Sequence, residues 1–386
     1  MRAVAFAGHS LPMTDLYIGL MSGTSLDGVD GVLVDFSAGG PRPLQVMAHV
    51  HRAFEPALAG ELLALNTPGD NELHRAAVAG NALARVYGET VEAVLRLAGT
   101  PRSAVRAIGA HGQTVRHRPG EFDATGYSLQ LNNPALLAEL CSIDVVADLR
   151  SRDIAAGGQG APLVPAFHRA VFGRSGQTVA VLNIGGIGNL TVLHADGRTI
   201  GFDCGPGNAL MDHWCRLHTG RPFDDAGAWA ASGDVIEALL AHMLADAYFA
   251  KPAPKSTGRD LFHPAWLEAK LQTLGAPVHA ANVQATLAEL SAAACATDVR
   301  SYGADACEVL VCGGGAFNAY LMHRLAALLP GISVMTSDQR GLPASQVEAC
   351  AFAWLARAFM RRECANLPGV TGATGPRLLG ALYPAR

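Results

Sequence analysis

The chain has 386 residues, half of them hydrophobic, and this length favours two domains that can each bury a core. A formal net charge of -4, three lysines and scattered arginines exclude the basic surface that a nucleic-acid-binding protein needs. The eight cysteines include no C-x-x-C pair and no apolar run reaches membrane-spanning length, so we expect neither a disulfide framework, a zinc site nor a membrane span.

The first segment of the chain is residues 1–16, which precede the first predicted strand. This segment lacks the cationic start and long apolar core of a signal peptide. We therefore interpret it as an N-terminal extension and expect a cytoplasmic protein.

Two apolar strands follow over residues 17–36, joined by a turn of glycine, serine, threonine and aspartate. Glycines let backbone N–H groups converge on an anion, and the hydroxyls of Ser22, Thr24 and Ser25 add short donors. A carboxylate in the same turn suits a magnesium ion held through water. The turn is typical of a triphosphate site, with a long polar hairpin loop as the alternative.

The rest of the first half predicts an α/β sheet. Residues 44–54 form a candidate third strand, and residues 71–97 have the charge and alanine/leucine spacing of a long amphipathic helix. Residues 105–109 and 143–147 are short β-branched runs between helices, which indicates central strands.

The pattern restarts at residue 177. Residues 179–193 again read as strand, glycine turn and strand, followed by a short strand at 200–203. Helices are predicted from about 208, over 234–249, 283–302, 316–329 and 346–361, and a strand at 309–311 runs into the glycines 313–315. This weak internal repeat predicts two similar domains with a cleft between them.

Familiar phosphate-binding motifs are absent from the sequence. There is no G-x-x-x-x-G-K-[ST] loop, no G-x-G-x-x-G after the first strand, and no H-R-D or D-F-G signature. Three glycine turns remain, each after an apolar strand: residues 23–28, 185–188 and 313–315. Their order resembles the phosphate-1, phosphate-2 and adenosine motifs of the acetate/sugar kinase, Hsp70 and actin superfamily.

Longer motifs narrow the resemblance to the anhydro-N-acetylmuramic acid kinase family. They are M-S-G-T-S-L-D-G-V-D (21–30), H-G-Q-T (111–114), A-A-G-G-Q-G-A-P-L-V-P (155–165), G-F-D-C-G-P-G-N (201–208) and T-G-A-T-G-P (371–376). The likeness spans nearly the whole chain from Tyr17. Departures are the N-terminal extension, Leu149 where an aromatic residue is expected, and Ile187-Gly188 in the second turn.

The resemblance implies a fold of two similar actin/hexokinase-like (RNase H-like) domains around a central cleft. We expect domain I at residues 17–155, with part of the sugar site, and domain II at 156–386, whose C-terminal segment packs back on domain I. It also implies a homodimer, although a buried core explains the apolar helix faces of the second half equally well.

The reaction that the resemblance implies uses ATP and water to open 1,6-anhydro-N-acetylmuramic acid and phosphorylate O6, in cell-wall recycling. The substrate has no free 6-hydroxyl, so a base must activate water to attack the anomeric carbon. Asp203 is the candidate catalytic base, because it ends a strand before the Gly205-Pro206-Gly207 break and a helix. The alternative is an aspartate that caps this helix.

The nucleotide and metal residues follow from the three turns. Asp27 is the candidate magnesium ligand, with a plain turn aspartate as the alternative. Residues 313–315 would use backbone donors and the dipole of a following helix. The ATP-binding candidates are Gly23, Thr24, Ser25, Leu26, Asp27, Gly28, Val29, Asp30, Gly185, Gly186, Asn189, Gly313, Gly314 and Gly315.

The sugar carries a lactyl carboxylate, which bidentate arginine suits. Arg150 and Arg152 follow a predicted strand and are the candidates, with structural salt bridges as the alternative. The remaining candidates for the hydroxyls and the N-acetyl group are His111, Gln113, Asn133 and Glu348; a solvated helix face also explains Glu348. The polar loop at residues 255–259 is interpreted as lying near the nucleotide.

Three other functions fit parts of the pattern. One is a kinase of the same fold for another sugar or a carboxylate. Another is a nucleotide-dependent sensor without turnover. A third is a glycosidase, which would need two carboxylates at a fixed separation.

Overall fold

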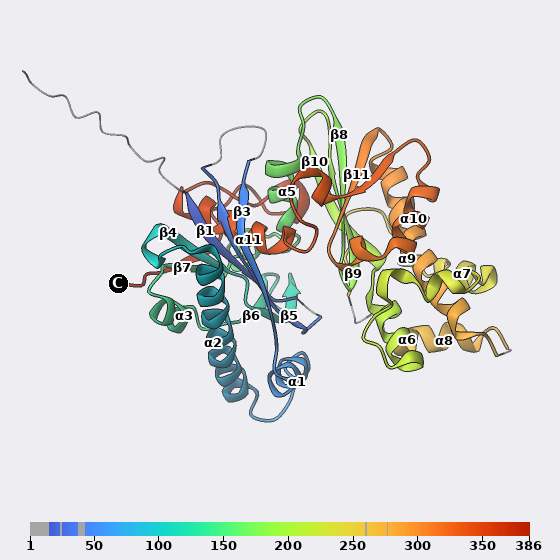
Figure 1. Ribbon diagram of the computed structural model, residues 1–386, viewed down its shortest axis with the longest axis horizontal. Coiled ribbons are helices and arrows are strands. Elements are labelled where there is room, and N and C mark those ends of the chain that lie inside the picture. Colours follow the sequence, from blue (N-terminus) through green and yellow to red (C-terminus); the bar gives the residue numbers. More distant parts are fainter. Residues whose placement is uncertain (1–14, 24, 38–42, 259–260, 276) are drawn as a thin grey trace, which may run out of the picture.

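The computed structural model describes residues 15–23, 25–37, 43–258, 261–275 and 277–386. These residues form two mixed β-sheets with helices on both faces, and a separate hairpin of β5 (Gln113–Pro119) and β6 (Gly126–Leu131). Figure 1 shows the two sheets side by side, with α5 and α11 between them.

The first sheet has the strand order β3-β2-β1-β4-β7-β13. β1, β2 and β3 form an antiparallel meander, β4 and β7 add in parallel, and β13 closes the edge antiparallel to β7. The bounds are β1 (Leu16–Met21), β2 (Gly28–Asp35), β3 (Gln45–Ala53), β4 (Val105–Ala110), β7 (Val145–Ala147) and β13 (Ala381–Tyr383).

The second sheet repeats the order of the first as β10-β9-β8-β11-β12. β8, β9 and β10 form the antiparallel meander, and β11 and β12 add in parallel. The bounds are β8 (Thr178–Ile184), β9 (Ile187–Leu193), β10 (Thr199–Pro206), β11 (Ala306–Cys312) and β12 (Ser333–Thr336). The predicted internal repeat is confirmed, because both halves share an RNase H-like arrangement of two antiparallel and two parallel pairings, to which the first sheet adds the antiparallel edge strand β13.

The helices form layers around these sheets (Figure 1). α2 packs against β2 and β3, α11 against β1 and β4, α5 against β9 and β10, and α9 against β9 and β10. The bounds are α1 (Pro56–Ala64), α2 (Glu72–Ala98), α3 (Pro134–Cys141), α4 (Ser151–Ile154), α5 (Val164–Phe172), α6 (Ala209–Thr219), α7 (Glu237–Leu244), α8 (Pro264–Gln272), α9 (Ala280–Tyr302), α10 (Ala319–Leu328), α11 (Val347–Met360) and α12 (Pro368–Thr371).

The C-terminal part of the chain returns to the first sheet. α11 lies flush on β1 and β4, because a Cβ at Gly19 would overlap the backbone of Ala349 and one at Gly109 would overlap that of Phe352. α5 in turn contacts α11, so apolar residues of both sheets share one core. The ends of β1 and β8 are thereby joined through one shared core.

Three expected elements differ from the structure. The predicted helix at 234–249 is confined to α7, and the chain after it forms turns. The glycines 313–315 lead into a 3-10 turn (Gly314–Phe317), and α10 begins only at Ala319. β10 continues through Pro206, so the prediction that Asp203 ends its strand is wrong. The β5–β6 hairpin was not predicted.

Candidate functional site

Asp203 lies inside β10 at an irregularity in its pairing with β9. Its Oδ2 accepts hydrogen bonds from Ser256 Oγ (3.0 Å) and Thr257 N (3.0 Å). No described residue hydrogen bonds to its Oδ1. The carboxylate is therefore held by one oxygen while the other is open to a ligand. Burial raises the pKa of Asp203, and the bonds from Thr257 and Ser256 lower it.

A row of polar side chains runs across the second sheet from Asp203. In the strand register, Asp203 lies opposite Asn189 on β9, and Asn189 lies opposite Asn183 on β8. Directly opposed residues project from the same face of a sheet. Asn183 hydrogen bonds to Glu348 at the start of α11, so the row reaches the helix that packs on the first sheet.

Glu348 joins this row to the first glycine turn. Burial raises its pKa, the bond from Asn183 lowers it, and the negative charges of Asp30 and Asp27 raise it. Arg150 acts on Glu348 in the opposite direction. Carboxylates from β2, from the turn before it and from α11 are thus near enough to interact electrostatically, and their combined negative charge favours a cation nearby.

The turn between β1 and β2 holds its polar groups by local bonds. Ser25 Oγ donates to Asp27 Oδ1 (2.6 Å), and Asp27 is exposed. Asp30 Oδ1 accepts from His49 Nε2 (2.9 Å) and His51 Nδ1 (3.2 Å). Leu26 takes a left-handed backbone conformation in this turn. Thr24, predicted to bind ATP, lies outside the described residues.

Other ATP candidates in this region have backbone and core roles. Val29 is fully buried in the first core, so only its backbone can face a ligand. Gly28 begins β2, and a Cβ there would overlap the backbone of Arg52. Gly23 accepts a hydrogen bond from Gln113 Nε2 (2.9 Å) through its carbonyl oxygen.

The glycine turns of the second half come together. Asn208 N donates to Gly185 O (2.8 Å) and Gly207 N to Gly186 O (3.0 Å), which ties the β8–β9 turn to the start of α6. A Cβ at Gly313 would overlap the Asn183 side chain, and one at Gly315 the Ile184 side chain. The turn after β11 therefore packs against the end of β8 as closely as glycine permits.

The structure corrects the expected helix-dipole role of residues 313–315. The first turn of α10 is capped by the Asn318 side chain, whose Oδ1 accepts from Leu321 N (3.0 Å). Because α10 starts at Ala319 and is already capped, its N-terminus is not presented by Gly313, Gly314 or Gly315. The backbone groups of these glycines remain candidates for a nucleotide.

His111 and Arg150 form a buried link behind the first turn. His111 Nδ1 lies 3.1 Å from Ser22 O, and its Nε2 lies 2.9 Å from Arg150 Nη2. Arginine only donates, so Nε2 accepts and Nδ1 carries the proton. Burial and the charge of Arg150 lower the pKa of His111 to about 3. Burial lowers the pKa of Arg150 to about 10, and Arg150 also donates to Gly160 O (2.8 Å).

The remaining candidates for sugar binding differ in whether their polar side-chain atoms already have partners. Asn133 caps α3 through Leu136 N (3.0 Å) and donates to Asn81 Oδ1 (2.7 Å), so its side chain is already engaged. Arg152 is exposed and has no ion-pair partner among the described residues. Gln113 keeps a buried, unpartnered Oε1 within the described part of the chain.

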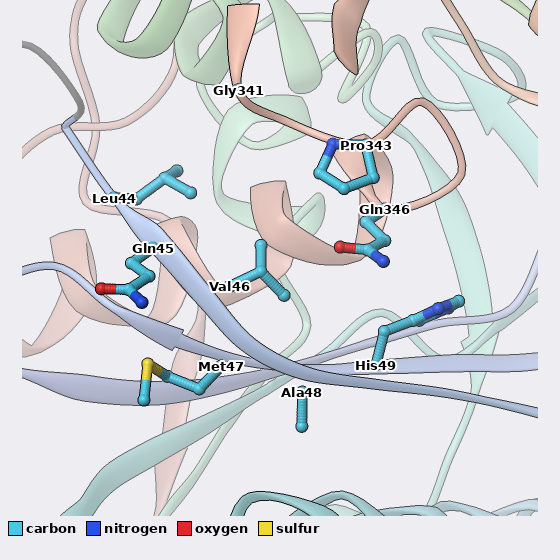
Figure 2. A pocket seen from close by; sticks show the side chains of 9 residues that line it. All are labelled: Leu44, Gln45, Val46, Met47, Ala48, His49, Gly341, Pro343 and Gln346. Atoms are coloured by element: carbon cyan, nitrogen blue, oxygen red, sulfur yellow. The ribbon is translucent and has the colours of Figure 1, made fainter.

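A cavity of about 570 Å³ lies beside the carboxylate cluster rather than on the predicted residues. Figure 2 shows that β3 forms one wall and the segment before α11 the other, with His49 and Gln346 projecting between them. His49 is one of the two histidines that bind Asp30, so the cavity adjoins the first turn. Across the described residues, no helix is long and apolar enough to cross a membrane.

This chain is similar to known proteins over nearly its whole length. The family model for anhydro-N-acetylmuramic acid kinase matches residues 15–385. The anhydro-N-acetylmuramic acid kinase of Variovorax paradoxus is 63% identical over 96% of this chain and 99% of its own length. That of Albidiferax ferrireducens is 60% identical over 97% of this chain and 100% of its own length.

The chain belongs to the anhydro-N-acetylmuramic acid kinase family. The sequence resemblance is thereby confirmed, and with it membership of a family of phosphotransferases. Among solved structures, a ROK family glucokinase from Streptomyces griseus in complex with glucose and AMPPNP aligns with a TM-score of 0.39 at 14% identity. The alignment covers 89% of this chain and 99% of that one.

Several polar residues of this family member's site were missed from the sequence. Asn183 is the one polar residue in the apolar run 179–184, and that contrast was an available signal. Ser256 and Thr257 were predicted only as part of a loop near the nucleotide, and their hydrogen bonds to the Asp203 carboxylate were not predicted. Nothing in the spacing of residues 203 and 256 could have indicated this contact.

Proposed function

We propose that this chain is an ATP-dependent kinase that hydrolytically opens 1,6-anhydro-N-acetylmuramic acid and phosphorylates its O6. The observation that carries the proposal is the polar row from Asp203 through Asn189 and Asn183 to Glu348, which ends at the carboxylates of the first glycine turn. A candidate base and a candidate phosphate site thus lie along one line. Family membership supports the choice of substrate.

In the proposed reaction Asp203 acts as the general base. Its free Oδ1 takes a proton from water, whose oxygen bonds to the anomeric carbon while the bond from that carbon to O6 breaks. O6 bonds to the γ-phosphorus of ATP, the bond to the β,γ-bridging oxygen breaks, and ADP leaves. The products are N-acetylmuramic acid 6-phosphate and ADP. A base must reach its water directly, and the one-sided anchoring of Asp203 supports this role.

ATP would be held by the backbone of both sets of glycine turns, with Ser25 adding a hydroxyl. A bound magnesium ion would supply charge neutralisation of the phosphates. The described residues contain no group of three His, Cys, Asp or Glu side chains arranged to hold a metal ion. The exposed Asp27 still fits the ion, because magnesium keeps several waters and takes only one or two carboxylates. Asp27 and Asp30 both lie close enough to Glu348 to raise its pKa.

Arg152 is the proposed partner of the lactyl carboxylate, since it is exposed and without an ion-pair partner among the described residues.

We further propose domains at 17–155 and 156–386, with α11 and β13 returning to the first sheet. Family resemblance supports a homodimeric, cytoplasmic enzyme. Light scattering of the purified protein would measure its mass in solution.

The proposal is tested by coupled measurement of ADP release with 1,6-anhydro-N-acetylmuramic acid and, separately, with N-acetylmuramic acid. We expect turnover with the anhydro sugar alone. Asp203→Asn should abolish turnover and leave ATP binding intact. Asp196→Asn, an exposed aspartate in the same β9–β10 hairpin, is the matched control. Absence of ADP release by the unmodified enzyme with the anhydro sugar would sink the proposal.

A further inference from the structure

A short segment, residues 255–257, lies along the outer edge of β10 next to Asp203. Asp203 N donates to Lys255 O (3.1 Å), and Ser256 and Thr257 donate to Asp203 Oδ2. β10 is the edge strand of the second sheet, so no further strand holds this side of Asp203. The position of the carboxylate therefore depends on what holds residues 255–257.

Lys255 anchors that segment through a buried ion pair. Its Nζ lies 3.1 Å from Asp298 Oδ2, and the two side chains are only 3% and 8% exposed. The Lys255 ammonium also lies over the rings of Tyr248 (5.3 Å) and Phe202 (5.8 Å). Asp298 belongs to α9, which packs on β9 and β10. The segment is thus tied to the helix behind the sheet.

Tyr248 adds a second tie to the same place. Its hydroxyl donates to Asp203 O (2.6 Å) while its ring faces the Lys255 ammonium. The backbone of Asp203 is therefore fixed on both sides, by Lys255 O at its N–H and by Tyr248 at its carbonyl. A displacement of Lys255 would therefore disturb the contacts at both the N–H and the carbonyl of Asp203.

We propose that Lys255 and Asp298 are positioning residues for the Asp203 carboxylate. Their ion pair holds the segment so that Ser256 and Thr257 bind Oδ2 and leave Oδ1 for the water. The inference rests on the proposed function of Asp203 as the base. Neither Lys255 nor Asp298 touches substrate in this scheme; both act through residues 256 and 257.

A purely stabilising role accounts poorly for this pair. Removing two charges from water costs about as much as their attraction returns, so a buried ion pair contributes little net stability against an apolar pair. What the pair does supply is a fixed geometry. Misplacement of a catalytic group by about 1 Å can cost 100-fold in rate.

A test of this proposal must distinguish the titration of Asp203 from that of the ionisable groups around it. The titratable side chains that face it or its anchor, among the described residues, are Lys255 on the edge segment, Tyr248 after α7, Cys204 on β10, and Asp298 and Cys295 on α9. Loss of the Ser256 and Thr257 bonds removes the interactions that lower the pKa of Asp203. Loosening the segment therefore raises the pKa of Asp203. The acid limb of the pH profile of kcat/KM, where activity falls as Asp203 is protonated, then moves to higher pH.

The experiment measures kcat, KM for ATP, melting temperature and the pH profile of kcat/KM for three variants. Lys255→Met breaks the ion pair with little change in shape. Ser256→Ala removes one bond to Asp203 at an exposed position and changes no charge. Lys251→Met is the matched control, because Lys251 is exposed and lies 5.6 Å from the same Tyr248 ring but makes no ion pair with Asp298.

We expect Lys255→Met to lower kcat by about 10- to 100-fold, to leave KM for ATP unchanged, and to move the acid limb upward. Ser256→Ala should move the acid limb in the same direction with a smaller fall in kcat, and Lys251→Met should match the unmodified enzyme. If Lys255→Met fails to fold, Ser256→Ala alone decides. An unshifted acid limb in the folded variants, with only a lower melting temperature for Lys255→Met, overturns the inference. An unmodified enzyme without turnover overturns instead the proposed function on which it rests.

Discussion

At the scale of single residues, His111 shows how a buried side chain can be fixed in one protonation state. Both ring nitrogens have partners, and the guanidinium of Arg150 stands at Nε2 where a proton would have to bind. Burial and the positive charge of Arg150 depress the pKa of His111 to about 3, against an ordinary 6.5. The neutral His111 side chain thus fixes the positions of Arg150 and the first turn relative to each other.

The stability of the protein should fall as pH drops from 6.5 towards 3. In this window the unfolded chain binds a proton at His111 that the folded chain refuses, which gives a slope of up to about 1.4 kcal/mol per pH unit. Urea unfolding at pH 7 and pH 5 measures it. His111→Gln should be less stable at pH 7 and should lose this part of the dependence. The buried His168, with a similar pKa of about 3, stays in both proteins, so their difference isolates His111. Equal pH dependence would contradict the assignment.

Substitution of Arg152 should weaken substrate binding, whereas substitution of Arg150 should destabilise the fold. Arg152 is exposed without an ion-pair partner among the described residues, whereas Arg150 donates to His111 and Gly160 inside the protein. Arg152→Gln should raise KM for the anhydro sugar about tenfold or more without changing the melting temperature. Arg150→Gln should lower the unfolding free energy by about 2 kcal/mol, as expected for a lost charged hydrogen bond.

An anhydro sugar without the lactyl group provides the control for this pair. Its KM should be indifferent to Arg152→Gln, because it has no carboxylate for the arginine to bind. If Arg152→Gln leaves KM for the carboxylate-bearing sugar unchanged, the assignment of Arg152 is wrong.

At the scale of elements, the seating of α11 on β1 and β4 depends on two glycines. A Cβ at Gly19 or Gly109 would enter the helix backbone, so α11 would have to move away from the sheet. We expect Gly19→Ala and Gly109→Ala each to cost about 3 kcal/mol, the upper part of the range for overpacked cores. Chemical denaturation checks this. Gly60→Ala on α1, where a Cβ meets nothing, should be neutral or stabilising by up to about 1 kcal/mol. Equal effects at residues 19 and 60 would contradict the packing argument.

Most elements could be predicted because their apolar residues follow one period over many positions. Residues 71–97 and 346–361 coincide closely with α2 and α11, and the strands around both glycine turns were found. The errors occur where a tertiary contact overrides the structure that the local sequence pattern predicts. β10 runs past Asp203 because its pairing with β9 resumes after an irregularity, and the glycines before α10 pack on Ile184 rather than begin the helix. Neither event has a periodic signature.

At the scale of the whole molecule, the site could be predicted only as separate pieces. The sequence identified Asp27, Asp203 and Glu348 as separate candidates, and the strand register places Asp203, Asn189 and Asn183 in one row that reaches Glu348. Contacts between distant positions, such as those of Asp203 with residues 256 and 257, left no trace in the spacing. The residues proposed to carry the chemistry are visible in the sequence, and the residues that hold them in place are not.

Asp153 illustrates such a contact across the chain. It is fully buried, and its carboxylate accepts from Gly160 N (2.8 Å), Asn366 Nδ2 (2.7 Å) and Thr371 Oγ1 (2.8 Å). One side chain thus binds the loop after α4 to the C-terminal segment. Gly160 O in turn accepts from Arg150, which holds His111 and, through it, the first turn. The C-terminal segment is therefore connected to the site by a chain of hydrogen bonds.

Replacing Asp153 by Asn should disturb both ends of this chain. The new amide cannot accept all three donors, and a buried donor left without an acceptor costs about 1–3 kcal/mol. We expect a loss of unfolding free energy in that range, measured by denaturation, and a lower kcat at a temperature where the variant is fully folded. Asp70→Asn, at an exposed loop position before α2, is the control and should change neither. Because the hydrogen bonds of the described residues link Asp153 to the site through Gly160 and Arg150, Arg150→Gln should remove most of its effect on kcat. Additive effects of the two substitutions on kcat would show that the C-terminal segment acts on the site by another route.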